Sequence, residues 1–185
     1  MRSVDLFRLK GDKQMFTGRA VWFIWVGVVV MFGYLGCNSF AADEARDLAL
    51  SMTLAKVKLF AGLTDAERDA LKDAATLRRG KSGERIIRQG KAMGRMFIIM
   101  EGQAEVRVNG KHIVTLSGQT LVGEIEFLDK LPASADVFLL KDTDLIELNY
   151  IALTDLMEKQ PRLGYVLMGE IARIEAQRLR ATNPK

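Results

Sequence analysis

The sequence has very few of the residues that build disulfide bonds and metal centres. It contains one cysteine, Cys37, and one histidine, His112, among 185 residues. A single cysteine excludes an intramolecular disulfide and a cysteine-pair metal site, and a single histidine excludes a histidine-rich metal centre. We therefore expect His112 to be structural, and we expect no bound metal and no cofactor.

The sequence also lacks the patterns of a catalytic site. A lone histidine cannot complete a nucleophile, base and orienting group, and no glycine-rich phosphate loop followed by lysine is present. The net charge of +4 is concentrated near the N-terminus, where residues 1–19 hold five basic and two acidic side chains. The remainder is nearly neutral, so no basic surface for nucleic acid is indicated. We expect a protein that is neither an enzyme nor a nucleic-acid binder.

What the sequence does contain is a long uncharged run from Ala20 to Ala42. As a helix, this run would cross a hydrocarbon core of about 30 Å. Trp22, Trp25 and Tyr34 lie toward its ends, where interfacial aromatic residues are common. Because basic residues precede the run, the positive-inside rule places residues 1–19 in the cytoplasm. We predict a single-pass anchor over 20–42 in the inner membrane, with the rest of the chain in the periplasm.

Two other interpretations fit the same segment. Ser39-Phe40-Ala41 is compatible with signal-peptide cleavage, and Cys37 after Gly36 is compatible with lipidation. The leader and the apolar run are longer than in most signal peptides, and Tyr34 stands where lipidation sites usually have leucine. The retained anchor is preferred, with a secreted or lipidated periplasmic binding module as the alternative.

The pattern becomes helical after residue 42. A connecting helix is predicted over 43–62, with one apolar stripe formed by Leu48, Met52, Ala55 and Leu59. Thr64-Asp65-Ala66-Glu67 is a capping box that predicts the start of a further helix. Three apolar residues around that helix are expected to face inward: Leu63, Leu71 and Ala75.

Short apolar runs separated by glycine-containing turns predict β-structure over residues 63–150. Asn109-Gly110 between two such runs is a strong signal for a tight hairpin. Short strands at this spacing predict a mainly β domain, an antiparallel barrel or jelly roll, with flanking helices. The predicted strands are Glu84–Arg88, Met96–Met100, Glu105–Val108, Ile113–Leu116 and Ile146–Leu148.

Helices return over residues 151–185. A short helix is predicted over Ala152–Glu158, a break at Gln160-Pro161, and a long helix over Arg162–Leu179. An apolar stripe on the long helix either packs on the barrel or extends into a helix-mediated dimer. Its members are Leu163, Leu167, Ile171 and Ile174.

Several segments, in order, resemble the cyclic-nucleotide-binding domain family, which includes catabolite-activator-type proteins. They are KLFAGLTDAERDAL, GERIIRQG, MFIIMEGQAEV and GEIEFLDKLPASADV, followed by the helix pair around Pro161. The resemblance covers roughly residues 55–180 and implies a jelly-roll β-barrel flanked by helices. Transcription factors of this kind carry a helix-turn-helix after the long helix, and we expect no such module here.

The resemblance also implies a ligand pocket around the phosphate-binding cassette. In the family, a Gly-Glu pair is followed about ten residues later by an arginine and a small residue. Gly123 and Glu124 match the pair, and Ser134 with Ala135 match the small residues, but Ala133 stands at the arginine position. Glu124 then corresponds to the ribose-binding carboxylate, and Ala133 marks a lost phosphate contact.

Other charged residues of the cassette are also expected to disfavour phosphate binding. We expect Glu126 and Asp136 to add negative charge near the phosphate position, and Lys130 to lie on an exposed turn. Losing one charge-assisted bidentate contact costs about 1.5–3 kcal/mol, or about ten- to 150-fold in affinity. We therefore do not expect cyclic nucleotide to be a partner.

The sequence thus favours a non-catalytic, membrane-anchored accessory subunit that uses a degenerate cyclic-nucleotide-binding fold as a scaffold within an integral membrane protein complex. The alternative hypothesis is a sensor of cyclic nucleotide or another small anion that signals through its anchor or a partner.

Overall fold

The computed structural model describes residues 42–182. The predicted cytoplasmic segment 1–19 and the anchor with Trp22, Trp25 and Tyr34 lie outside these residues, apart from Ala42. Within residues 42–182, no helix combines the length and the apolar character needed to cross a membrane. The domain described below belongs to one compact unit, Ala45–Lys185.

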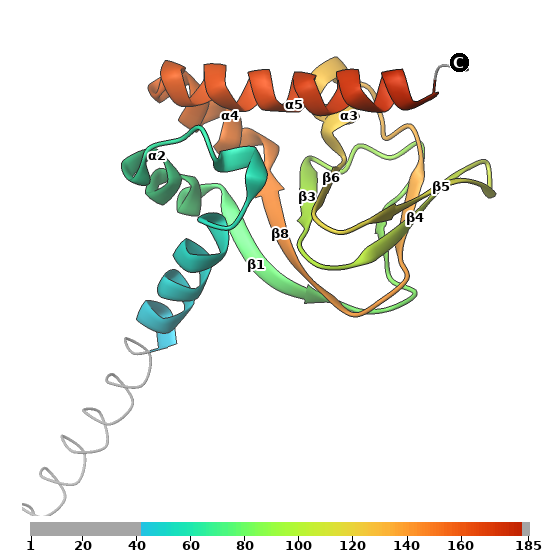
Figure 1. The fold of residues 1–185 in the computed structure, drawn as a ribbon, viewed down its shortest axis with the longest axis horizontal. Helices are drawn as coiled ribbons and strands as arrows, with labels where there is room; N and C mark the ends of the chain where they lie inside the picture. Colours follow the sequence, from blue (N-terminus) through green and yellow to red (C-terminus); the bar gives the residue numbers. More distant parts are fainter. Residues whose placement is uncertain (1–41, 183–185) are drawn as a thin grey trace, which may run out of the picture. The chain divides into compact units, whose positions relative to one another are not determined.

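Two four-stranded antiparallel sheets form the body of the domain (Figure 1). One sheet has the strand order β1-β8-β3-β6 and the other the order β2-β7-β4-β5. Apart from the hairpin of β4 and β5, consecutive strands thus alternate between the sheets, as in a jelly roll, so the predicted β architecture is confirmed. The strands are β1 (Ala75–Gly80), β2 (Arg85–Ile87), β3 (Arg95–Ile99), β4 (Gln103–Val108), β5 (Lys111–Ser117), β6 (Thr120–Val122), β7 (Asp136–Leu139) and β8 (Thr143–Asn149).

The five predicted strands correspond to β2, β3, β4, β5 and β8, whereas β1, β6 and β7 were not predicted. Strand β1 carries two arginines and no regular apolar alternation, and it is held by pairing with β8 along its whole length, from Ala75↔Leu148 to Gly80↔Thr143. Strand β6 has only three residues. Long-range pairing, which local sequence cannot encode, therefore decides these strands.

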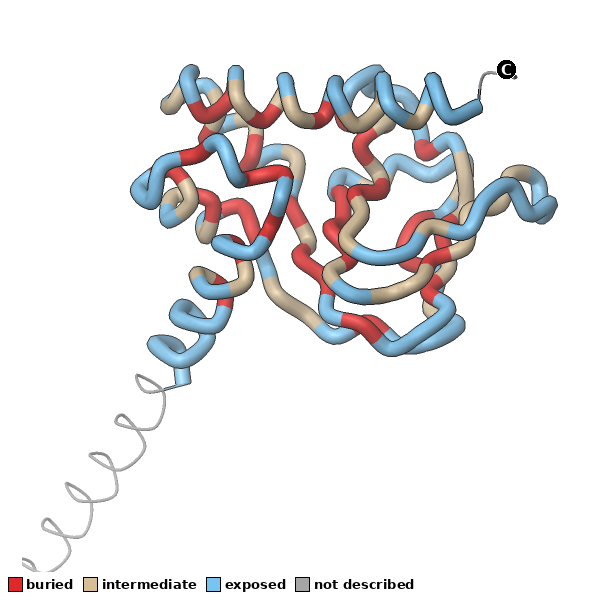
Figure 2. The backbone as a smooth tube through the Cα atoms, viewed as in Figure 1, coloured by how far each residue is buried: buried red, intermediate tan, exposed pale blue. Residues whose placement is uncertain are grey.

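The predicted tight hairpin between β4 and β5 is present. Val108 pairs with Lys111, which leaves Asn109 and Gly110 as a two-residue loop. Their φ angles are 52° and 77°, so both lie in the left-handed region that a type I′ turn requires. In Figure 2 the tip of this hairpin is exposed, whereas buried positions gather where the helices meet the sheets.

The connecting helix differs from the prediction in both length and orientation. It ends at residue 54, and its buried positions are Leu50 and Leu54. Leu59, from the predicted stripe, is buried as predicted but lies beyond this helix, in the short helix η1 (Lys58–Phe60). Leu48 and Met52, from the predicted stripe, are 63% and 57% exposed. Leu50 and Leu54 are apolar residues four positions apart, and so are Leu48 and Met52. Only the packing of the helix on the domain decides which of these pairs is buried.

The helical segments before the first strand and after the last strand pack around one core cluster. The capping box predicted at Thr64 is formed, and Leu63, Leu71 and Ala75 are buried as predicted. The remaining helical elements are η1 (Lys58–Phe60), α2 (Asp65–Ala70), η2 (Leu71–Asp73), α3 (Glu124–Asp129), α4 (Tyr150–Lys159) and α5 (Pro161–Thr182).

The long helix α5 packs its apolar stripe inside its own domain. Leu163, Leu167 and Ile171 are buried in one core cluster that also contains Phe60 and Leu71, and Ile174 packs partly against it. This face of α5 is therefore already covered, and a helix-mediated dimer stays a prediction that would need another face. A second cluster, which includes Phe97 and Val137, fills the barrel near the cassette.

The capping box gives a first testable prediction. Thr64 Oγ1 accepts a hydrogen bond from Glu67 N, while Glu67 Oε2 accepts one from Thr64 N at 2.8 Å. Thr64→Ala leaves these helix-end N–H groups less satisfied, so we expect a loss of about 1 kcal/mol in the free energy of unfolding. Urea denaturation measures it. Thr53→Ala is the control, because the Thr53 hydroxyl only donates to Ala49 O within its own helix. Equal losses of unfolding free energy in the two variants would contradict the role of Thr64 as a helix cap.

Candidate ligand pocket

The cassette begins at a backbone position that only glycine fits. Gly123 has φ of 91° and caps the six-residue helix α3. A Cβ at this residue would lie 3.1 Å from both Arg95 O and Met96 Cα, on strand β3. The Tyr150 hydroxyl also donates a hydrogen bond of 2.5 Å to Gly123 O. This close approach fixes where the next residue, Glu124, enters the barrel.

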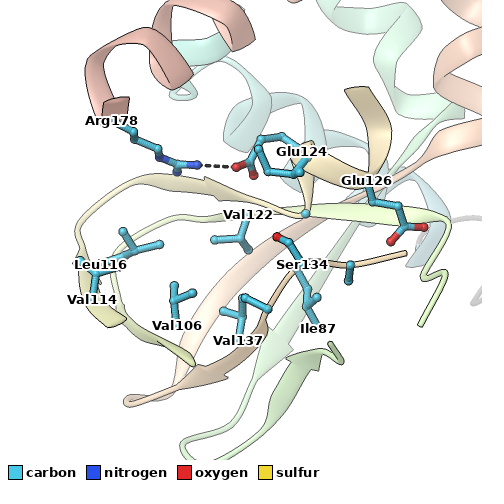
Figure 3. A pocket seen from close by; sticks show the side chains of 14 residues that line it. Ile87, Val106, Val114, Leu116, Val122, Glu124, Glu126, Ser134, Val137 and Arg178 are labelled. Atoms are coloured by element: carbon cyan, nitrogen blue, oxygen red, sulfur yellow. Dashed lines mark hydrogen bonds and ion pairs between the residues drawn. The ribbon is translucent and has the colours of Figure 1, made fainter. Parts of the chain in front are cut away.

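A cavity of about 200 Å³ lies beside this turn (Figure 3). All five cassette residues singled out from the sequence line it: Gly123, Glu124, Ala133, Ser134 and Ala135. The structure therefore brings the predicted site residues together. Most of the wall is apolar and comes from both sheets, as Ile87, Val106, Val114, Leu116, Val122 and Val137.

Ala133 occupies the position where the sequence indicated a lost cation. It is 6% exposed, and its backbone is held by Lys91 O, which accepts from Ala133 N at 3.0 Å, and by Gly90 N, which donates to Ala133 O at 2.8 Å. Ser134, next to it, is exposed. This end of the cavity thus presents a methyl group and a hydroxyl-bearing residue, with no positive charge.

A cation that the sequence reasoning missed enters the cavity from α5. Arg178 Nη1 donates to Glu124 Oε1 and, at 2.8 Å, to Glu175 Oε1. Arg178 Nη2 donates to Leu121 O and, at 3.3 Å, to Thr120 Oγ1. These four contacts use all the terminal N–H groups of the guanidinium. Figure 3 shows the ion pair between Arg178 and Glu124 at the edge of the cavity.

A sequence signal for Arg178 exists. The apolar stripe of α5 runs through Leu167, Ile171 and Ile174, and Arg178 is the next position on the same face. An arginine that continues an inward-facing stripe requires a partner in the domain, and that partner is the cassette carboxylate.

Glu124 is a buried carboxyl group with a strongly raised pKa. It is 4% exposed, and its Oε2 has no hydrogen-bond partner among the described residues. Burial raises the pKa of Glu124 to about 7, although the positive charge of Arg178 acts in the opposite direction. The neighbouring Glu175 carboxylate raises this pKa further.

Two other acidic residues of the cassette, Glu126 and Asp136, also have structural roles, and of these two only Asp136 lies away from the cavity. Glu126 accepts hydrogen bonds from Met93 N at 2.8 Å and Gly94 N at 2.9 Å, so its carboxylate holds the loop before β3. Asp136 accepts from Gln89 N at 3.0 Å and does not line the cavity. The Glu126 carboxylate also lines the cavity, so it adds a negative charge near the expected phosphate position, as predicted. Lys130 is exposed, as predicted, and lies over the Phe127 ring.

Comparison with known proteins agrees with this geometry. Residues 77–160 match the family described as "Cyclic nucleotide-binding domain". The fold is that of a cyclic nucleotide-binding domain. A cyclic nucleotide-binding domain from Methylobacillus flagellatus superimposes with a TM-score of 0.63 at 21% identity, covering 73% of this chain and 79% of that structure. The catabolite activator protein of Thermus thermophilus gives 0.55 at 26% identity, covering 66% of this chain and 58% of that structure.

Comparison with curated sequences finds matches over part of each relative. The chain is 36% identical over 106 residues to a cAMP-dependent protein kinase regulatory subunit of Mycosarcoma maydis. That match covers 55% of this chain but 20% of the relative, so the chain spans about a fifth of that protein's length. The similarity concerns a binding domain, and the activity of the larger protein does not follow from it.

The residues around the cavity provide hydrogen-bonding groups and apolar surface. Within residues 42–182, no group of three or more His, Cys, Asp or Glu side chains is placed to hold a metal ion. The cavity is lined by two carboxylates (Glu124 and Glu126), a guanidinium paired with Glu124, the Ser134 hydroxyl and apolar walls.

The raised pKa of Glu124 predicts a specific pH dependence of stability. An unfolded glutamate titrates near 4.3, so between that pH and about 7 the folded state binds more protons than the unfolded state. The contribution of Glu124 to stability therefore falls as pH rises through this window, by up to about 1.4 kcal/mol per pH unit. Thermal unfolding of wild type and Glu124→Gln from pH 4.5 to 8 measures it, and we expect the variant to gain relative to wild type as pH rises.

Glu105→Gln is the control for this experiment. The hydrogen bond from Arg107 lowers the pKa of Glu105, so its contribution is lost as pH falls rather than as pH rises. Parallel pH profiles for wild type and Glu124→Gln would contradict the burial-raised pKa.

Proposed function

We propose that this protein is a non-catalytic regulatory or accessory subunit whose cyclic nucleotide-binding fold no longer recognises a cyclic phosphate. The observation that carries this proposal is the absence of an available cation in the described pocket. Ala133 supplies none, and Arg178 is the one cationic residue among the cavity's lining residues.

The contacts of Arg178 explain why it does not replace the lost arginine. Its terminal N–H groups already bind Glu124, Glu175, Thr120 and the backbone of Leu121. A phosphate that recruited this guanidinium would have to break its ion pair with Glu124. That exchange would leave a buried carboxylate without its counter-charge, which is costly in a site with low water access.

The membrane-anchored role remains part of the proposal. The uncharged run from Ala20 to Ala42 supports an inner-membrane anchor with the domain in the periplasm, and an integral membrane protein complex as the partner. In such a complex the domain would act by contact with its partner.

A sensor of a small anion is the second candidate. It is favoured by the open cavity of about 200 Å³, which a pure scaffold would have no need to keep. In that case an anion would displace Glu124 from Arg178 and so use the guanidinium of α5.

Restoring the missing cation separates these two functions. In the full chain, we expect Ala133→Arg to bind cAMP or cGMP about ten- to 150-fold more tightly than wild type, because a charge-assisted contact is regained. Isothermal titration calorimetry measures both affinities. Leu131→Arg is the control, since Leu131 is 61% exposed and does not line the cavity. Wild-type affinity equal to or higher than that of Ala133→Arg would favour the sensor.

The anchor is tested independently of the pocket. We expect the full chain to sediment with membranes and to resist extraction at alkaline pH, because about twenty apolar residues in helix are effectively fixed in a bilayer. A variant with Val28→Lys and Val29→Glu in the uncharged run should appear in the soluble fraction. Equal distribution of the two proteins would contradict the anchor.

A further inference from the structure

The pocket contains one buried side-chain oxygen that the described residues leave without a hydrogen-bond partner. Glu124 Oε2 is buried and accepts no hydrogen bond, while Oε1 is bound by Arg178. Buried carboxylate oxygens in native structures are nearly always paired, so an orphan one points to a missing donor. The last torsion of a glutamate side chain is soft, which allows the carboxylate to turn Oε2 toward the cavity that Glu124 lines.

The walls of the cavity define the rest of the missing molecule. Six apolar side chains from both sheets face it, and its volume is about 200 Å³. A single water needs only about 10–15 Å³ of the same kind of volume, so the cavity can accept a molecule of many atoms. Apolar walls of this kind favour a ring or another apolar body.

The charges around the cavity restrict the ligand further. An anion finds no available cation, because the terminal N–H groups of Arg178 are already bound. A cation would compete with Arg178 for Glu124 at close range and would be repelled by the guanidinium. An uncharged hydroxyl or amine can donate to Glu124 Oε2 and leaves the charge of Glu124 matched by Arg178. Ser134, exposed beside Ala133, adds a second hydrogen-bonding group.

We propose that this pocket binds an uncharged small molecule that combines a hydroxyl donor, held by Glu124, with a flat apolar or aromatic ring packed against Val106, Val122 and Val137. This inference rests on the proposed function, since it assumes that phosphate recognition has been lost. It adds the chemical class of the ligand that the same site would take.

Adenosine and cAMP form a probe pair for this proposal. Both carry the same aromatic base and a free ribose 2′-hydroxyl, whereas adenosine is uncharged and cAMP carries a negative charge. In calorimetric titrations of the full chain, we expect adenosine to bind at least about tenfold more tightly than cAMP, because only cAMP places a charge in a cavity without an available cation.

Variants of the carboxylate link the signal to the site. Glu124→Ala should weaken adenosine binding by about ten- to 150-fold, the effect of losing a charge-assisted hydrogen bond. Glu105→Ala is the matched control, because Glu105 neighbours Val106 on β4 but does not line the cavity. Thermal unfolding of each variant verifies that it is folded, and the wild-type comparison of the two probes does not depend on any variant.

Each outcome has a distinct meaning. Preference for adenosine, lost in Glu124→Ala and kept in Glu105→Ala, supports the inference. If wild type does not bind adenosine up to millimolar concentration, the proposed ligand class is wrong. If Ala133→Arg gains cAMP binding in that case, the proposed function still stands. Tighter binding of cAMP than of adenosine by wild type overturns both.

Discussion

The ion pair between Glu124 and Arg178 is the interaction on which the site depends. It joins the first residue of α3 to the last turns of α5, and the same guanidinium binds the carbonyl of Leu121 in β6. Two elements far apart in the chain are thereby fixed against the edge of one sheet. A buried pair of this kind contributes little net stability, because the desolvation of both charges offsets their attraction. Breaking it from one side is costly, and this cost holds Arg178 in place.

The ion pair also decides what the cavity can accept. Ala133, at one end of the cavity, carries no charge. At the other end, the positive charge of Arg178 is paired with Glu124. Glu126, which appeared from the sequence to add negative charge, is bound by the backbone N–H groups of Met93 and Gly94. Because Glu126 also lines the cavity, two carboxylates stand there against one guanidinium, which fits an uncharged ligand better than a phosphate.

Local sequence signals predicted the parts of the fold that local chemistry determines. The Asn109-Gly110 turn, the Thr64 capping box and the break at Pro161 depend on the backbone preferences of a few neighbouring residues, and all are present. The strands β1 and β6 depend on pairing with distant strands and could not be read locally. The choice of Leu50 and Leu54 over Leu48 and Met52 as the buried stripe is likewise made by packing, because both stripes are equally apolar.

The candidate site shows the same division. Motif spacing identified Gly123, Glu124, Ala133, Ser134 and Ala135, which the fold brings around one cavity. Arg178 lies about fifty residues away in sequence and carries no motif, so its role depends on how α5 crosses the barrel. The structural role of Glu126 was also hidden, because it depends on two backbone donors of a distant loop.

A double-mutant cycle at pH 8 tests the central ion pair most directly. Wild type, Glu124→Gln, Arg178→Gln and the double variant would be compared by urea denaturation of the full chain. If the two side chains are paired as described, the coupling free energy should be at least about 1 kcal/mol. Additive losses, with a coupling energy below about 0.3–0.5 kcal/mol, would show that Arg178 is not held by Glu124 and is available to an anionic ligand.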